Sequence, residues 1–182
     1  MVRKIDMRCP MSAPVTATAS HPIARDEYIS PKRRSSVSVE DKFIGTWKLV
    51  SWTVEQADGE VTDSPLGSNP LGSLMYQPGG RMSVALMRPD RPRFASNNLV
   101  DATPEEIKTG FEGYLAYCGS YEVNEAERFI IHRLEFSSFP NWVETDQKRY
   151  FEFTGNRLTL KTPPVTVMGA VEVHSLVWER LQ

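Results

Sequence analysis

From Phe43 to the end of the chain, apolar and polar residues alternate in short runs separated by turn-forming residues. Alternation with period two is typical of half-buried β-strands, because successive side chains point to opposite faces. The runs cover residues 43–54, 72–77, 81–87, 117–123, 128–136, 147–154, 157–161 and 171–180. In the first run, strict alternation puts Trp47 and Leu49 on one face and Val50 and Trp52 on the other. About eight strands with short links predict an all-β fold with one short helix, a closed antiparallel β-barrel around one ligand.

The one helix is predicted by its start signal. Residues 103–106 (TPEE) supply an N-cap, a proline at the first helical position and a capping-box glutamate. Ile107, Phe111, Tyr114 and Leu115 follow at helical spacing. We expect this apolar stripe to rest on the sheet.

The composition changes near residue 40. Residues 1–40 are rich in Ser, Pro, Ala, Thr and Arg and almost lack aromatic residues, which predicts a disordered tail before a barrel domain at 41–182. The tail has no apolar core segment, so it is not a secretory signal. Two alternatives stay open: a different targeting segment, such as a mitochondrial presequence, or a true start at Met7 or Met11.

The bulk composition excludes several classes of protein. A chain of 182 residues with 40% hydrophobic and 24% charged residues fits one globular domain. The net charge of −2 attracts neither nucleic acid nor an anionic membrane, and no apolar run reaches the roughly 18 residues that span a bilayer. Cys9 and Cys118 form neither a disulfide framework nor a metal-ligand pattern, so we expect a reducing, cytoplasmic location and no metal or other cofactor. Cys118 is expected to be a buried small apolar residue. The oligomeric state is not predicted.

His132 is a polar residue on a predicted inward face. In the run 128–136 it shares a side with Ile130, Leu134 and Phe136, which is the more apolar side. A buried imidazole is costly unless it bonds to a neighbouring group, to water or to a ligand.

The adjacent strands add polar groups to the same interior. Arg149 falls on the same side as Phe151, and a four-residue link at 124–127 sets Tyr121 opposite Ile130. Two interpretations stay open. The groups form a self-satisfied polar network, or they form a patch that orients the carbonyl, carboxylate or phenol of a ligand.

Six residues are further candidates for ligand binding: Tyr76, Ser83, Tyr117, Trp142, Phe151 and His174. Tyr76 and Ser83 are the weaker ones, because whichever face of the run 81–87 points inward carries a methionine, Met82 or Met87. Trp142 lies on a predicted loop at the barrel mouth, either as a lid over the cavity or as a hydrophobic plug. For His174, a structural role and a role in the site both stay open.

The opening run FIGTWKLVS resembles the Gly-x-Trp strand of lipocalins, and the chain more closely resembles the small lipocalin-like domain family of bacteria and filamentous fungi over about residues 41–181. The matching pieces are Pro70-Leu71-Gly72, Leu74, Tyr76, Gly80, Met82-Ser83-Val84, Tyr114 to Val123, His132, Pro140-Asn141-Trp142, Gln147, Arg149, Leu158 to Pro164 and Leu176 to Arg180. The resemblance implies a barrel in which Trp47 packs against Arg180 in a structural cation–π pair. Many fungal members look like accessory proteins of natural-product pathways, and related folds include cyclases and isomerases, an analogy that assigns no chemistry.

Three functions stay open. The first is a cofactor-free isomerase, cyclase or dehydratase acting on an apolar polyketide- or terpenoid-like intermediate of secondary-metabolite biosynthesis. There His132 would be the general acid or base, and Arg149 and Tyr121 would polarise a carbonyl or stabilise an enolate. The second is a non-catalytic binder or carrier of a hydrophobic metabolite, and the third is a structural module with a filled core. Of these we favour the enzyme.

Overall fold

The computed structural model describes residues 38–98 and 100–181. The chain divides into two units, Met1–Ser35 and Ser36–Gln182, and all of the elements below belong to the second unit. The predicted tail at 1–40 lies outside the described residues except for its last three, and Cys9 lies outside them as well.

The described part of the chain is built almost entirely from strands. They are β1 (Gly45–Gln56), β2 (Val61–Asp63), β3 (Leu71–Gln77), β4 (Arg81–Met87), β5 (Tyr114–Asn124), β6 (Phe129–Ser137), β7 (Asp146–Thr154), β8 (Arg157–Lys161), β9 (Val165–Val167) and β10 (Ala170–Arg180). The helical elements are η1 (Glu40–Lys42), α1 (Pro104–Glu112) and η2 (Pro140–Trp142).

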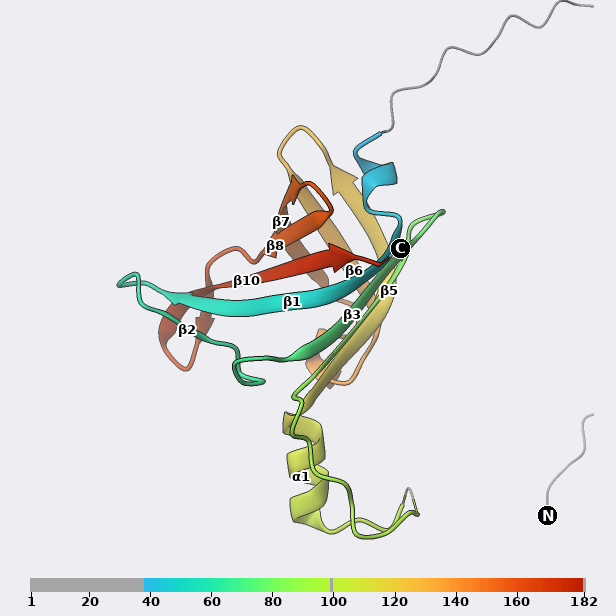
Figure 1. Ribbon diagram of the computed structural model, residues 1–182, viewed down its shortest axis with the longest axis vertical. Coiled ribbons are helices and arrows are strands. Elements are labelled where there is room, and N and C mark those ends of the chain that lie inside the picture. Colours follow the sequence, from blue (N-terminus) through green and yellow to red (C-terminus); the bar gives the residue numbers. More distant parts are fainter. Residues whose placement is uncertain (1–37, 99, 182) are drawn as a thin grey trace, which may run out of the picture. The chain divides into compact units, whose positions relative to one another are not determined.

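Eight of these strands form a closed antiparallel barrel in the order β1, β3, β4, β5, β6, β7, β8 and β10. The ring closes because β10 pairs with β1 along most of its length (Figure 1). Two short strands lie outside the ring, with β2 paired to β1 and β9 paired to β10. The predicted fold class, a closed barrel of about eight strands with one short α-helix, is confirmed.

One end of the barrel is sealed by aromatic rings and an arginine. The Arg180 guanidinium lies 4.2 Å from the centroid of the Trp47 ring and donates to the backbone carbonyls of Ile44 and Lys42. The Trp47 indole N–H donates to the carbonyl of Phe43 at 2.8 Å. The cation–π pair implied by the lipocalin resemblance is therefore present, and it ties the end of the chain to the start of the barrel.

A β-bulge in β1 changes which side chains face inward. Val50 is an extra residue between the pairs that Leu49 and Ser51 make with β10. Because a bulge shifts the two-residue alternation by one position, Trp52 is buried on the same side as Trp47 and Leu49. The prediction that Trp52 faces away from Trp47 was wrong.

A second bulge, in β6, has the same effect at Glu135. Alternation predicted that Phe136 faces inward. Because of the bulge, Phe136 is instead 64% exposed. Its partner in β5, Cys118, is half-buried and lines a groove on the outside of the barrel, so the expectation of a buried cysteine was also wrong.

The register between β5 and β6 also differs from the prediction. Asn124 pairs with Phe129, so the link occupies residues 125–128 and not 124–127. Tyr121 therefore pairs with His132 instead of Ile130. Both Tyr121 and His132 still point inward and are buried, because the register differs by two residues and parity is preserved.

The start of α1 is formed as predicted, but its apolar side does not rest on the sheet. The Thr103 side chain and the Glu106 side chain form a reciprocal capping box. The helix ends at Glu112, and Ile107 and Phe111 are 56% and 50% exposed. Figure 1 shows α1 lying beyond the ends of β3 and β5.

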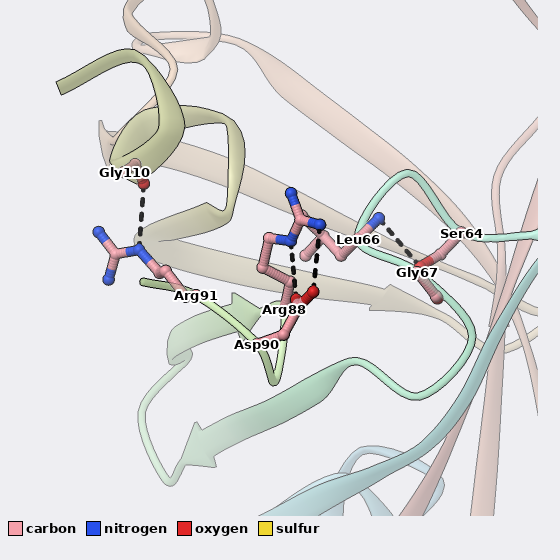
Figure 2. Close-up of polar contacts among 7 residues, drawn as sticks. All are labelled: Ser64, Leu66, Gly67, Arg88, Asp90, Arg91 and Gly110. Atoms are coloured by element: carbon pink, nitrogen blue, oxygen red, sulfur yellow. Dashed lines mark hydrogen bonds and ion pairs between the residues drawn. The ribbon is translucent and has the colours of Figure 1, made fainter. Parts of the chain in front are cut away.

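The loop after β4 holds α1 in this position. Arg91 donates to the carbonyl of Gly110 at 3.2 Å (Figure 2). The Phe94 ring lies so close to Gly110 that a Cβ added there would be 3.0 Å from it. Arg88 and Asp90 form an ion pair at the start of the same loop. The helix therefore packs on its own connecting loop, which explains why the predicted stripe stays exposed.

None of the helices in the described ranges has the length and apolar character needed to cross a bilayer. The cytoplasmic location stays a prediction.

Gly45 gives a direct test of the sealed end. It has a φ of +135°, and a Cβ there would lie 2.6 Å from Arg180 Nη1. We expect Gly45→Ala to lower the free energy of unfolding by about 2–4 kcal/mol, because it combines backbone strain with a clash. Gly155→Ala is the matched control, because Gly155 has a φ of +61° and open space around it. This variant should lower the free energy of unfolding, measured with urea, by roughly 1 kcal/mol. Equal costs for the two variants would contradict this description of the sealed end.

Candidate functional site

The barrel contains a cavity of about 530 Å³ in the half away from Trp47 and Arg180. Its walls are mainly apolar and include Trp52, Leu66, Leu86, Leu115, Trp142 and Leu176. Phe111 of α1 and Phe139 also line it and are 50% and 37% exposed, so they mark its opening to solvent. A cavity of this size and lining is typical of a site for a small, largely apolar molecule.

Leu66 reaches the cavity through a tight turn before β3. The Ser64 hydroxyl accepts a hydrogen bond from the Leu66 N–H and donates to the carbonyl of Gly67 at 2.9 Å (Figure 2). This side-chain-supported turn buries Leu66 to 6% exposure although it lies in a loop. The loop therefore forms part of the cavity wall.

Arg149 of β7 brings a positive charge to this apolar lining. Its side chain is half-buried and lines the cavity, and one guanidinium nitrogen donates to the carbonyl of Lys148 at 2.7 Å. Within residues 38–98 and 100–181, Arg149 forms no ion pair with a carboxylate. The guanidinium thus has donors left for a ligand.

His174 and Glu172 of β10 form a second polar group on the lining. The Trp52 indole N–H donates to His174 Nδ1 at 3.1 Å, and Gln56 donates to Glu172 Oε2 at 3.2 Å. His174 Nε2 and Glu172 Oε1 are 4.0 Å apart. Burial lowers the pKa of His174; the charge of Glu172 opposes this shift, and the charge of Arg149 adds a smaller lowering. The net shift is downward, so this imidazole is neutral near pH 7.

His132 belongs to the packed core and does not line the cavity. It is fully buried, and its Nε2 lies 2.7 Å from the Tyr76 hydroxyl. Burial, with a smaller contribution from the charge of Arg149, lowers the pKa of His132 to about 3. Burial likewise raises the pKa of the Tyr76 hydroxyl well above its usual value. Both groups are therefore neutral at ordinary pH, and together they form a buried polar contact.

The other predicted site residues divide between the cavity and its surroundings. Tyr117, Trp142 and His174 line the cavity beside Arg149, and the rings of Tyr117 and Trp142 pack edge to face at 5.8 Å. Trp142, carried by η2, is thus part of the wall.

Tyr76, Tyr121 and Phe151 are buried outside the cavity lining. Tyr121 donates to the carbonyl of Gln77 at 3.2 Å, and Tyr76 and Phe151 each pack edge to face on Phe43. Ser83 lines the outer groove of the barrel instead, because its neighbours Met82 and Val84 take the inward positions. Ser83, one of the two weaker candidates, therefore does not face the cavity.

Sequence reasoning missed Trp52, Glu172 and Leu66 among the cavity residues. Glu172 is two residues from His174 in the same strand, so parity would have placed it on the same face. Trp52 was hidden by the bulge at Val50, and Leu66 reaches the cavity from a turn, where alternation gives no signal.

A barrel sealed at one end, with an apolar cavity and a few polar groups on its lining, defines the class of small-molecule-binding β-barrels. Residues 44–181 match the lipocalin-like domain family, and the chain belongs to this family. The 4'-hydroxy-3'-methoxypropiophenone carrier protein ppsC of Aspergillus oryzae is 35% identical over 107 residues, which cover 55% of this chain and 96% of that protein. The crystal structure of a lipocalin-like protein from Bacteroides uniformis has 15% identity and a TM-score of 0.40, covering 77% of this chain and 99% of that one.

The buried His132 should make the barrel sensitive to acid. Below its ordinary pKa of 6.5 the unfolded chain binds a proton that folded His132, with a pKa of about 3, does not. This contribution to stability is therefore complete above pH 6.5 and is lost as the pH falls towards 3. The free energy of unfolding, measured with urea, should fall between pH 7.5 and pH 4.5 in the wild type. In His132→Gln it should fall by about 2–3 kcal/mol less over the same range. Parallel pH dependences would show that folding does not lower the pKa of His132.

Proposed function

We propose that this protein binds and carries a small, mainly apolar molecule that presents a carbonyl or similar oxygen to Arg149. The observation that carries the proposal is the cavity of about 530 Å³ in which a guanidinium without a carboxylate partner among the described residues interrupts the apolar lining. A half-buried charge is poorly solvated and gains from an oxygen acceptor brought by a ligand.

The energetics suit a carrier of moderate affinity. Apolar contact with rings such as Trp52, Tyr117 and Trp142 supplies non-directional binding energy, at about 25 cal/mol for each Å² of apolar surface buried. A hydrogen bond from a charged donor adds about 1.5–3 kcal/mol and fixes the orientation of the ligand. Arg149 would therefore set specificity while the walls supply most of the affinity.

The carrier protein from Aspergillus oryzae supports this proposal. The compound in its name is an aromatic ketone with one hydroxyl and one methoxy substituent, which combines an apolar ring with a carbonyl acceptor. A molecule of this kind has the polarity that the cavity and Arg149 require. We therefore propose an aryl ketone or a related aromatic metabolite as the ligand class.

Tryptophan fluorescence gives a direct binding assay, because Trp52 and Trp142 line the cavity. We expect 4'-hydroxy-3'-methoxypropiophenone to change the emission saturably and Arg149→Met to weaken binding by about 10- to 100-fold, the loss of one charged hydrogen bond. Arg157→Met is the matched control, because Arg157 is exposed on β8 and does not line the cavity, and it should leave the affinity unchanged. Equal weakening by both variants would contradict a specific role of Arg149.

A cofactor-free isomerase, cyclase or dehydratase is the second candidate function. His174 and Glu172 favour it, since both line the cavity and both can take part in proton transfer. His132 does not line the cavity, and its imidazole is engaged by Tyr76. The general acid or base would therefore be His174 or Glu172 and not His132, while Arg149 could still polarise a carbonyl.

Hydrogen exchange separates the two candidates. An enzyme of this kind should catalyse the exchange of the protons next to the carbonyl of a bound aryl ketone in D2O, observed by proton NMR, and Glu172→Gln should abolish the effect. A carrier should bind the same ketone without accelerating exchange above that in buffer. Exchange that survives Glu172→Gln would exclude Glu172 as the base.

A further inference from the structure

We infer that Glu172 and His174 form a subsite that selects ligands with a hydroxyl group, a phenol or an alcohol that keeps its proton. The inference rests on the proposed function, because the hydroxyl belongs to the molecule that fills the cavity. It adds a second point of recognition to the one at Arg149 and assigns it to β10.

Trp52 fixes which nitrogen of His174 carries the proton. An indole N–H can only donate, so His174 Nδ1, at 3.1 Å from it, must be the acceptor. In the neutral imidazole the proton then resides on Nε2. His174 therefore presents a hydrogen-bond donor at Nε2.

Glu172 presents the complementary acceptor. Gln56, its cross-strand neighbour in β1, donates to Oε2, which leaves Oε1 as the oxygen nearest to His174 Nε2. The side chains of His174 and Glu172 are 14% and 12% exposed, and both line the cavity. The donor and the acceptor are thus held side by side by the pairing of β1 with β10.

The gap between the two groups fits one oxygen atom. At 4.0 Å, Nε2 and Oε1 are too far apart for a good direct hydrogen bond. An oxygen placed about 2.8 Å from each would make its two hydrogen bonds at roughly 90° to one another, close to the geometry of a hydroxyl. The pair can therefore be bridged without a change in either side chain.

Only certain groups satisfy both sides of the pair. A hydroxyl accepts from Nε2 and donates to the carboxylate, which is an acceptor only. A methyl ether can accept but has no proton to give, and a bare ring leaves the donor and the acceptor unpaired, which is costly for side chains that are only 14% and 12% exposed. The subsite should thus distinguish a phenol from its methyl ether.

The test compares the affinities of 4'-hydroxypropiophenone, 4'-methoxypropiophenone and propiophenone in fluorescence titrations of the full chain. We expect the hydroxy ketone to bind at least 10-fold more tightly than either of the others. Burial of the extra methyl group alone would instead favour the methoxy compound about fourfold, so the two explanations predict opposite orders.

Variants assign the preference to the pair. Glu172→Met and His174→Phe should each reduce the preference for the hydroxy ketone to about threefold or less. Glu152→Met is the control, because Glu152 is an exposed carboxylate on β7 that does not line the cavity, and it should keep the full preference. Arg149→Met should lower the affinity for all three ketones and leave the ratios between their affinities unchanged.

The outcomes distinguish this inference from the proposed function. If the wild type binds the hydroxy and methoxy ketones equally, or prefers the methoxy compound, the hydroxyl subsite is overturned while the ketone-binding cavity stands. If none of the three ketones binds, the proposed function itself fails. The wild-type ratio decides the inference even if one of the two variants does not fold, and the other variant then assigns it.

Discussion

The pairing of β1 with β10 is the interaction on which the rest of the structure depends. It closes the ring of strands, and the Arg180–Trp47 contact secures it at the sealed end. The same pairing places Gln56 beside Glu172, so the strands that close the barrel also position polar groups on its lining. Closure and recognition therefore share one structural cause, because the cavity exists only while these two strands remain joined.

The buried polar groups of the barrel have two separate roles. His132 and Tyr76 contact one another away from the cavity, and burial keeps both neutral. Arg149 and His174 line the cavity, where a ligand can reach them. The charge of Arg149 lowers the pKa of both histidines, so it acts electrostatically on the core and on the site. A polar residue inside a barrel is thus not by itself a site residue.

The sequence predicted the architecture well, because alternation, turn residues and the capping box at Thr103 are local signals. It placed Arg149 inside because parity within β7 is unbroken. It failed where one extra residue in a bulge shifts the alternation of inward and outward side chains. The bulge at Val50 turns Trp52 inward, and the bulge at Glu135 turns Phe136 outward. It also could not separate the core from the cavity lining, because both face inward and only packing distinguishes them.

The most direct test of the central claim is a crystal structure of the protein with 4'-hydroxy-3'-methoxypropiophenone bound. We expect the ligand to occupy the cavity in the half of the barrel away from Trp47, with its carbonyl oxygen within hydrogen-bond distance of the Arg149 guanidinium. Ligand density in the outer groove beside Cys118, or a cavity closed by its own side chains while the ligand binds elsewhere, would contradict it.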